Sequence, residues 1–426
     1  MHLARSLYPG LQGEVGMTDD NLRGVYSRRY FLNSSATLAF AHSRAGVAVS
    51  SFSQVKSDKV LAYVGTYTGS GNNGEGIYPF EMNPQTGALS HRRLVARTAS
   101  PSWIAIHPSK RYLYAINEVS DFRGNSGSAG AFAIDSVSGD LSPLNTVSSE
   151  GAGPAYLSVD SSGRFAFVAN YAGGSIAVLP ILTDGSLGAA VDLHRDTGNL
   201  GSSQSTSAAP GSITAGGHEG PHAHMIDADP ENRVALAADL GQDRIYTYRF
   251  NSSSGKLTAS ANAPFVSLPS GDGPRHFVFH PNGLWFYSVQ EQASTVIFFR
   301  YDPRTASLSS LQTISTLPPG FAGTSFASEI LISPDGRFLY AANRLHDSVA
   351  VFAIDANGML THIGQTQTLG DYPRHCRIDP LGNFIYVCNQ RSDSITSFSI
   401  HRDSGMLTFT GQYTPVGSPA VITFLA

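Results

Sequence analysis

The sequence has little charge, few cysteines and no long apolar run. Charged residues make up 14% of the 426 residues and the formal net charge is −4, so no basic surface is indicated and nucleic acid is not an expected partner. No run of about 18 apolar residues occurs, so no transmembrane helix is predicted. After about residue 50 no segment has a 3.6-residue apolar period, which predicts almost no helix. The 43 glycines and 10% aromatic residues are typical of an all-β chain with many turns.

The two cysteines, Cys376 and Cys388, flank one predicted turn. Because their strands are hairpin neighbours, a disulfide between the two strands is conceivable. The alternative, which we favour, is that both are small buried strand residues.

One pattern is present six times along the chain. Each copy begins with a proline-led or small-residue turn and a short apolar strand. A turn of Pro, Asp, Asn or Gly follows, then a second strand ending near Asn or Glu, and a third ending in Phe. The copies begin at Pro101, Pro154, Pro221, Pro274, Ser328 and Pro373. A period near 50 residues with several strands per unit is typical of a β-propeller, so any ligand is expected at the central axis.

Each copy predicts a four-stranded antiparallel blade. In the first copy the predicted strands are Trp103–His107, Tyr112–Asn117, Gly130–Ile134 and Leu141–Ser148. The segment from Ala62 supplies second, third and fourth strands without a first, whereas Ser418–Ala426 supplies a lone first strand. Joined, these two segments predict a seventh blade and an all-β, seven-bladed propeller over residues 59–426. N-terminal strands would pair with the C-terminal strand to close the ring, so we expect the last nine residues to be indispensable.

Residues 1–50 are interpreted as a leader. Ser27–Leu32 read SRRYFL and precede a mildly apolar stretch, a pattern that resembles a twin-arginine export signal. The twin-arginine export machinery is then an expected partner, and the expected location is periplasmic or otherwise exported. The alternative is a disordered basic leader on a cytoplasmic protein.

Residues 195–220 are rich in Gly, Ser and Thr and account for the longest step between copies. They predict an insertion between two blades. Because the insertion ends at a His-rich segment, it either lies over the axis or forms an ordinary surface loop.

Candidate functional residues gather where first strands begin and second strands end. They are His222, His224, Arg275, His276, Glu291, Glu329, Arg344, His346, Arg374 and His375. Arginine binds a carboxylate or phosphate with two parallel hydrogen bonds, and histidine is the usual general base near neutral pH. A ring of these residue types therefore suits an anionic substrate with an acyl centre.

Structural roles are the alternative for several of these residues. The Arg-His pair occurs twice at the same repeat position, at 275–276 and 374–375, so a role in tying blades together stays open. Three aspartates that recur just before third strands are interpreted as stabilising turns: Asp243, Asp347 and Asp393. His222, His224, Glu291 and Glu329 break the repeat and are the better functional candidates.

A His-x-His segment can bind zinc, but no third ligand follows at a diagnostic spacing, so neither metal nor another cofactor is predicted.

At these residues the chain resembles the seven-bladed lactonase family, which includes the propeller-type 6-phosphogluconolactonases and the fungal carboxy-muconate lactonising enzyme. The resemblance covers residues 59–426 and rests on YVGTYT, GPHAH, DLGQDRIYTYRF, GPRHFVFHPNG, SEILISPDGRFLYAANRLHDSVAVF and YPRHCRIDPLGNFIYVCNQRSDSITSF. It implies a lactonase or lactonising activity without a required cofactor. The implied site residues are His224 (or His222), Arg275, Glu291 in VQEQ and Arg344 in ANR.

We therefore expect a hydrolase that opens a sugar lactone, with 6-phosphogluconolactone or a free aldonolactone such as gluconolactone as substrate. Arg275 and Arg344 would hold negative charge or the developing oxyanion, and His224, oriented by Glu291, would activate water. The other candidates would bind substrate: His222, His276, Glu329, His346, Arg374 and His375. Export would favour the free aldonolactone, because phosphorylated sugar lactones are cytosolic. A muconate-type cycloisomerase and a non-catalytic binding propeller remain alternatives.

Overall fold

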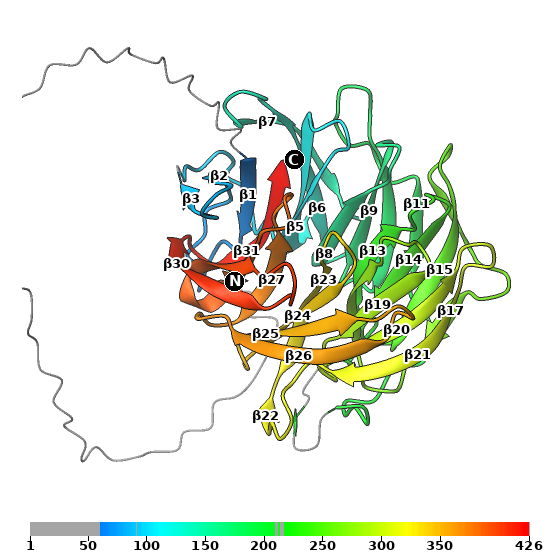
Figure 1. Cartoon of the computed structure of the whole chain (residues 1–426). Helices are drawn as coiled ribbons and strands as arrows, with labels where there is room; N and C mark the ends of the chain where they lie inside the picture. The colour runs from blue at the N-terminus through cyan, green and yellow to red at the C-terminus, as the bar shows by residue number, and fades with distance from the viewer. Residues whose placement is uncertain (1–59, 91, 209–211, 214–216, 426) are drawn as a thin grey trace, which may run out of the picture. The chain divides into compact units, whose positions relative to one another are not determined.

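The computed structural model describes residues 60–90, 92–208, 212–213 and 217–425; the predicted leader at 1–50 lies outside the described residues. Seven sheets of antiparallel strands form a ring (Figure 1). Each innermost strand contacts the innermost strands of both neighbouring sheets, in the closed order β31, β4, β8, β13, β18, β23, β27 and back to β31. The predicted seven-bladed propeller is therefore confirmed.

The strands of each blade are given from the axis outward. Blade 1 contains β31 (Pro419–Leu425), β1 (Val60–Thr66), β2 (Ile77–Met82) and β3 (Leu89–Ser90). Blade 2 contains β4 (Trp103–Ile106), β5 (Tyr112–Phe122), β6 (Ser126–Ile134) and β7 (Leu141–Ser148). Blade 3 contains β8 (Pro154–Val159), β9 (Phe165–Asn170), β10 (Ser175–Pro180) and β11 (Asp192–Arg195). Blade 4 contains β13 (Ala223–Ala228), β14 (Val234–Asp239), β15 (Arg244–Asn251) and, both pairing with β15, β16 (Lys256–Ala259) and β17 (Phe265–Ser267).

The remaining three blades follow the same plan. Blade 5 contains β18 (Pro274–Phe279), β19 (Trp285–Gln290), β20 (Thr295–Asp302) and β21 (Ser307–Ser315). Blade 6 contains β23 (Phe326–Ile332), β24 (Phe338–Arg344), β25 (Ser348–Ile354) and β26 (Leu360–Gln367). Blade 7 contains β27 (Pro373–Ile378), β28 (Phe384–Asn389), β29 (Ser394–Ile400) and β30 (Leu407–Pro415). Among the described residues the only helix is a 3-10 turn at Gln390–Ser392, and no helix is long and apolar enough to cross a membrane.

The strand limits predicted for blade 2 need one correction. The second strand continues past Asn117 to Phe122, and the third begins at Ser126 rather than Gly130. Phe122 pairs with Ser126 after an irregular register, so this hairpin is longer than the repeat indicates. The repeat pattern marks the part shared by all blades and therefore missed this extension.

The ring is closed in the predicted way. β31 pairs with β1 in antiparallel register, from Leu61 opposite Leu425 to Thr66 opposite Pro419. Buried side chains of both strands join residues of β28, including Phe384 and Tyr386, in one apolar cluster. Blade 1 is thus built from both ends of the described domain (Figure 1).

A tyrosine on the second strand repeatedly joins one blade to the next. Its hydroxyl donates to the carbonyl of a glycine in the turn between the third and fourth strands of the following blade. Five pairs, 2.7 to 3.0 Å long, are Tyr63 with Gly139, Tyr114 with Gly185, Tyr287 with Gly358, Tyr340 with Gly405 and Tyr386 with Gly87. All five glycines have a φ between 69 and 87°, a conformation that glycine adopts without strain. These bonds fix the angle between neighbouring blades.

The insertion at 195–220 is anchored where the structure describes it. Residues 212–213 form β12, which pairs in parallel with β22 (Gly323–Thr324) in the segment leading to blade 6. The backbone of Gly201 donates to Gly241, and the Ser205 hydroxyl donates to Asp272. The insertion therefore follows the end of the ring at which first strands begin and spans from blade 4 to blade 6.

Candidate active site

Several innermost strands share a local irregularity that affects which side chains reach the axis. In β18, Pro274 lies opposite Gln290 but His276 lies opposite Val289, so Arg275 is the extra residue of a β-bulge. A bulge redirects side chains away from regular alternation. The same register shift makes His224 the extra residue of β13 and Arg374 that of β27. Three predicted site residues are thus bulge residues.

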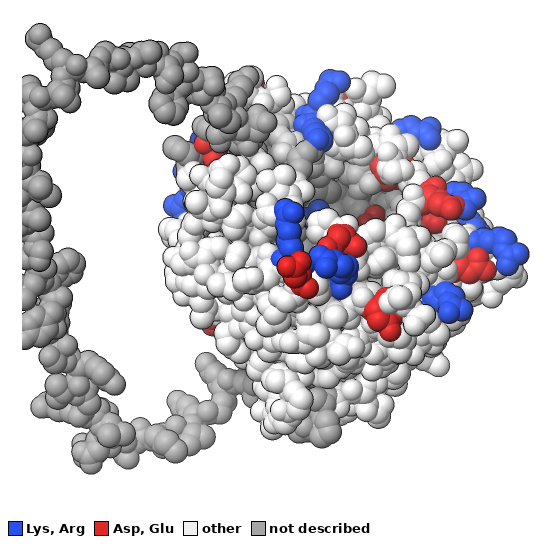
Figure 2. Space-filling view, in the orientation of Figure 1, with Lys and Arg blue, Asp and Glu red and all other residues white. Residues whose placement is uncertain are grey.

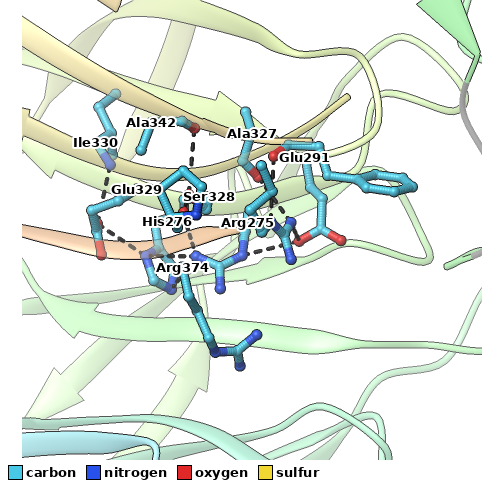
Figure 3. Close-up of polar contacts among 12 residues, drawn as sticks. Arg275, His276, Glu291, Ala327, Ser328, Glu329, Ile330, Ala342 and Arg374 are labelled. Atoms are coloured by element: carbon cyan, nitrogen blue, oxygen red, sulfur yellow. Dashed lines mark hydrogen bonds and ion pairs between the residues drawn. The ribbon is translucent and has the colours of Figure 1, made fainter. Parts of the chain in front are cut away.

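Two arginines from adjacent blades converge on one glutamate. Glu291 directly follows β19, and its Oε2 lies 3.0 Å from Nε of Arg275 (Figure 3). The same oxygen lies 2.6 Å from Nη2 of Arg344. Arg275 also donates to the carbonyl of Ser328, and Arg344 to that of Ala327 at 3.1 Å. All three side chains are at most 2% exposed. The predicted grouping of Arg275, Glu291 and Arg344 is therefore present.

Burial and mutual charge set the protonation of this group. Burial alone would raise the pKa of Glu291, but Arg344 and Arg275 outweigh it and hold that pKa below its usual value. Burial, assisted by the charge of Arg344, lowers the pKa of Arg275 to about 10. At neutral pH the group holds two cations and one anion, so it retains one net positive charge.

His224 lies beside this group. Its ring centroid is 5.0 Å from that of His276 and 5.4 Å from that of Tyr171, which follows β9. Burial, followed by the charge of Arg275, lowers the pKa of His224 well below its usual range, so the imidazole is neutral at pH 7. Its Nδ1 has no hydrogen-bond partner among the described residues.

The expected contact between Glu291 and His224 is not found in the described part of the chain. Glu291 instead binds Arg275 and Arg344. The physical reason is charge: a buried carboxylate beside two guanidinium groups is stabilised far more by them than by a neutral imidazole. Glu291 therefore orients the arginines.

Beneath the arginines, Glu329 joins two histidines. Its Oε1 lies 3.1 Å from Nδ1 of His276 (Figure 3). Its Oε2 lies 3.4 Å from Nε2 of His375. The backbone N–H of Ile422 donates to Nδ1 of His375, which places the proton of that ring on Nε2, facing Glu329. Burial lowers the pKa of His375 to about 3 and that of His276 well below its usual range, so both rings are neutral.

Aromatic rings cover this second layer. The Trp103 ring on β4 contacts His276 and His375, each with a centroid distance of 5.1 Å, and lies tilted by 33° against the Tyr156 ring at a centroid distance of 4.2 Å. His276 and His375 are each 2% exposed and Glu329 is 5% exposed. The predicted substrate contacts His276, Glu329 and His375 therefore lie in a layer that supports the arginines.

Arg374, on blade 7 next to blade 6, pairs with a different glutamate, Glu118. Its Nη2 lies 3.3 Å from Oε2 of Glu118, and its guanidinium carbon lies 4.9 Å from the centre of the Tyr67 ring. The same Glu118 oxygen accepts hydrogen bonds from the Tyr67 hydroxyl at 2.6 Å and the Ser102 hydroxyl at 2.5 Å. In Figure 3 the Arg374 side chain points away from Glu291.

The two other histidine candidates lie outside these groups. His222 precedes β13, stacks on Tyr171 at 4.3 Å and has its Nε2 3.3 Å from Glu219 of the insertion. His346 lies in the turn after β24, where its contacts are Ser348 at 2.6 Å and the ring of Phe321. His222 is thus beside the site, whereas the structure does not bring His346 to it.

The recurring aspartates do more than stabilise their own turns. Asp243, Asp347 and Asp393 adopt φ values of 50 to 52°, and each carboxylate accepts a backbone N–H from the segment entering the next blade. These donors are Gly271 and Gly273 for Asp243, Tyr372 for Asp347 and Ser418 for Asp393. The aspartates are structural, as predicted, but they act between blades.

The structure shows the state of the two cysteines and whether metal-ligating side chains gather. Cys376 and Cys388 are free and buried, and they belong to different apolar clusters, facing blade 6 and blade 1 respectively. The interpretation as small buried strand residues is confirmed. Among the described residues no three His, Cys, Asp or Glu side chains gather as metal ligands would.

Sequence reasoning missed two parts of the site. The sequence patterns assigned no role to Glu118, Tyr67 or Ser102. The signal was available, because Glu118 follows Asn117 as Glu291 follows Gln290. Trp103 was taken only as the beginning of a strand, since nothing local indicates that its ring crosses the axis.

Comparison with known proteins places this geometry in a family. The family model described as "Lactonase, 7-bladed beta-propeller" matches residues 61–424. A 6-phosphogluconolactonase of Bacillus subtilis is 34% identical over 371 residues, covering 86% of this chain and 99% of that protein. The solved structure of a periplasmic gluconolactonase of Pseudomonas aeruginosa has a TM-score of 0.77 and 32% identity, covering 86% of this chain and 99% of that one. The chain therefore belongs to the seven-bladed β-propeller lactonase family and is a lactonase.

Proposed function

We propose that the protein hydrolyses the ring ester of a sugar lactone to the corresponding aldonic acid. The candidate substrates are 6-phosphogluconolactone and a free aldonolactone such as gluconolactone. The observation that carries the proposal is the convergence of Arg275 and Arg344 on Glu291 beside the neutral imidazole of His224. The names of the similar proteins, a 6-phosphogluconolactonase and a gluconolactonase, support both candidates.

The roles of the side chains follow from their charge. A neutral His224 takes a proton from water as the water oxygen attacks the lactone carbonyl carbon. The net positive charge of the arginine pair stabilises the oxyanion that forms on the carbonyl oxygen. Collapse of this intermediate breaks the ring C–O bond, and the imidazolium returns its proton to the departing alkoxide. The products are the ring-opened hydroxyl and a carboxylic acid, and no cofactor takes part.

Burial limits access to this machinery. Arg275, Glu291 and Arg344 are 1 to 2% exposed and His224 is 4% exposed. A substrate must therefore gain access to side chains that are almost fully buried in this structure. Burial of the site is also the observation that favours the alternative of a non-catalytic propeller.

Hydrolysis of δ-gluconolactone and 6-phosphogluconolactone, followed with a pH indicator, tests the proposal. The full chain is compared with His224→Ala, Arg275→Ala and the surface control Glu231→Gln. Turnover above the spontaneous rate that is lost in the first two variants and kept in the control supports a lactonase with this site. If no turnover occurs on either lactone, a dicarboxylate diene tests the cycloisomerase alternative, and failure there favours a binding role.

We also propose that the protein is exported through the twin-arginine route. The support is the SRRYFL segment at Ser27–Leu32. Fractionation of cells making the full chain should place it outside the cytoplasm, and changing Arg28 and Arg29 to lysine should retain it inside. Cytoplasmic location of the unaltered chain would reject this route.

A further inference from the structure

We infer that Glu118, Tyr67, Ser102 and Arg374 form a second subsite, which binds the uncharged polyol end of the substrate and selects a free aldonolactone over a phosphorylated one. This inference rests on the proposed function, because it assigns the part of the lactone remote from the reacting carbonyl. It concerns residues to which the mechanism above assigns no role.

The subsite shares two local features with the arginine pair. Glu118 follows Asn117 of β5 as Glu291 follows Gln290 of β19, and Arg374 and Arg275 are both bulge residues. Blade 2, which carries Glu118, is three blades away from blade 5, which carries Glu291, in the closed order of the inner strands. In a ring of seven such blades lie on opposite sides of the axis. Glu118 and Glu291 therefore face a ligand on the axis from opposite sides, and Arg374 of blade 7 reaches Glu118 from beside blade 6.

The two groups differ in net charge. Glu291 faces two guanidinium groups, Arg275 and Arg344, whereas Glu118 faces one, Arg374. The hydroxyl of Tyr67 stays protonated, because burial raises its pKa well above the usual value, and it donates to Glu118. One group thus carries a net positive charge suited to an oxyanion, and the other is neutral.

Unused hydrogen-bonding atoms define what the neutral group takes. All three donors to Glu118 use its Oε2, and no described residue donates to its Oε1. Arg374 uses Nη2 for Glu118, and its side chain, 13% exposed, is the most accessible of the three channel arginines. One acceptor and further N–H donors therefore lie side by side. This set matches sugar hydroxyls, which both donate and accept.

A phosphate group does not match it. Phosphate oxygens accept hydrogen bonds and carry close to two negative charges at neutral pH. Placed against Arg374, they would also lie beside the Glu118 carboxylate, and like charges at short range in a desolvated site repel strongly. Glu118 therefore lowers the affinity for the phosphorylated lactone and raises the affinity for the free one.

Kinetics of the full chain on three lactones test the inference. These are δ-gluconolactone, its 6-phosphate, and δ-valerolactone, which has no hydroxyl groups. We expect kcat/KM to be higher for gluconolactone than for its 6-phosphate. Glu118→Gln should reduce this preference about tenfold or more, as expected for loss of a hydrogen bond to a charged group. Tyr67→Phe should weaken gluconolactone hydrolysis in the same direction, and in both variants the loss should be smaller for δ-valerolactone, which lacks the hydroxyl groups that the subsite would bind. Glu231→Gln is the control for a change of charge at the surface.

Binding of the products separates this inference from the proposed function. Calorimetric titration with gluconate and 6-phosphogluconate should show the same change of preference in Glu118→Gln, whether or not the protein turns over lactones. No turnover by the unaltered chain would reject the hydrolase, and the titration would still decide on the subsite. A preference for the phosphorylated compounds, or an unchanged preference in both Glu118→Gln and Tyr67→Phe, would overturn the inference.

Discussion

Nη2 of Arg344 lies 2.6 Å from Oε2 of Glu291, and neither side chain is more than 2% exposed. The same oxygen is 3.0 Å from Arg275. Removal of a buried carboxylate shared by two cations deprives both cations of this partner, and this makes Glu291 a sensitive position of the site.

Glu291→Gln should destabilise the fold and abolish activity. Loss of one partner from a buried ion pair costs about 3–5 kcal/mol, so the urea midpoint should fall markedly. Without the carboxylate the two guanidinium groups separate, and kcat/KM should fall about 100-fold or more. Glu231→Gln removes a surface partner of Arg233, and its urea midpoint should stay close to that of the unaltered chain. Equal urea midpoints for Glu291→Gln and Glu231→Gln would contradict a buried ion pair of Glu291 with the two arginines.

The pH dependence of catalysis should show the low pKa of His224. Burial and Arg275 hold this pKa well below the usual 6.5, so the neutral, base-competent imidazole persists as the pH falls. We expect kcat/KM, corrected for spontaneous hydrolysis, to remain level from pH 8 to below pH 6. An acidic limb with its midpoint at or above the usual histidine pKa would show that another group is the base.

Acid should destabilise the protein through its buried histidines. The pKa of His375 is about 3 in the folded state and about 6.5 when unfolded, so between these values the unfolded state binds more protons. This stabilising contribution is fully present above pH 6.5 and is lost progressively as the pH falls toward 3. His224 and His276 act in the same sense, whereas Glu329, whose pKa is raised by burial, acts in the opposite one.

Urea unfolding at several pH values measures this effect. Each neutral histidine contributes a slope of about 1.4 kcal/mol per pH unit within its window. In His375→Gln the slope of unfolding free energy against pH should fall by about 1.4 kcal/mol per pH unit, which corresponds to one bound proton fewer in the unfolded state. An identical slope in that variant would show that His375 is protonated in the folded state.

Removal of β31 should prevent formation of the closed ring. A chain that stops after Gly417 lacks Val421, Ile422 and Phe424, all buried. Their burial contributes about 1.5–3 kcal/mol each, a sum comparable to the total stability of many domains. Size-exclusion chromatography and circular dichroism should show aggregation or loss of cooperative unfolding. Tyr413→Ala, on the exposed side of β30, should remain monomeric and folded.

The thiols of Cys376 and Cys388 should be free but unreactive. Both are buried, and burial raises the pKa of each thiol, so little thiolate forms at pH 8. A thiol reagent should titrate almost none in the native protein and two in urea without reductant. Finding no thiols in urea would show that a disulfide forms.

The propeller could be predicted from the sequence because the burial pattern that produces each blade is repeated along the chain. Each blade buries the same strand faces, so the pattern from Pro101 to Pro373 is repeated, and the strands left over at both ends indicated the shared blade. The Arg275, Glu291 and Arg344 grouping could also be predicted, since equivalent repeat positions converge at the axis.

The details that decide the roles could not be predicted. The bulges at His224, Arg275 and Arg374 depend on pairing with the second strand, which local sequence does not encode. The assignment of Glu291 to the arginines rather than to His224 depends on which charges lie nearest in three dimensions. Trp103 covers His276 and His375 from another blade, and no local pattern reports a contact that distant.

The pairing of β31 with β1 also sets the order of events during synthesis. β1 is the first strand of the ring to leave the ribosome and β31 is the last, so the partner that β1 requires emerges after all other blades. Throughout translation the edge of β1 lacks its strand partner, so the nascent chain must stay soluble with this edge exposed. The ring can close only after every blade has been made.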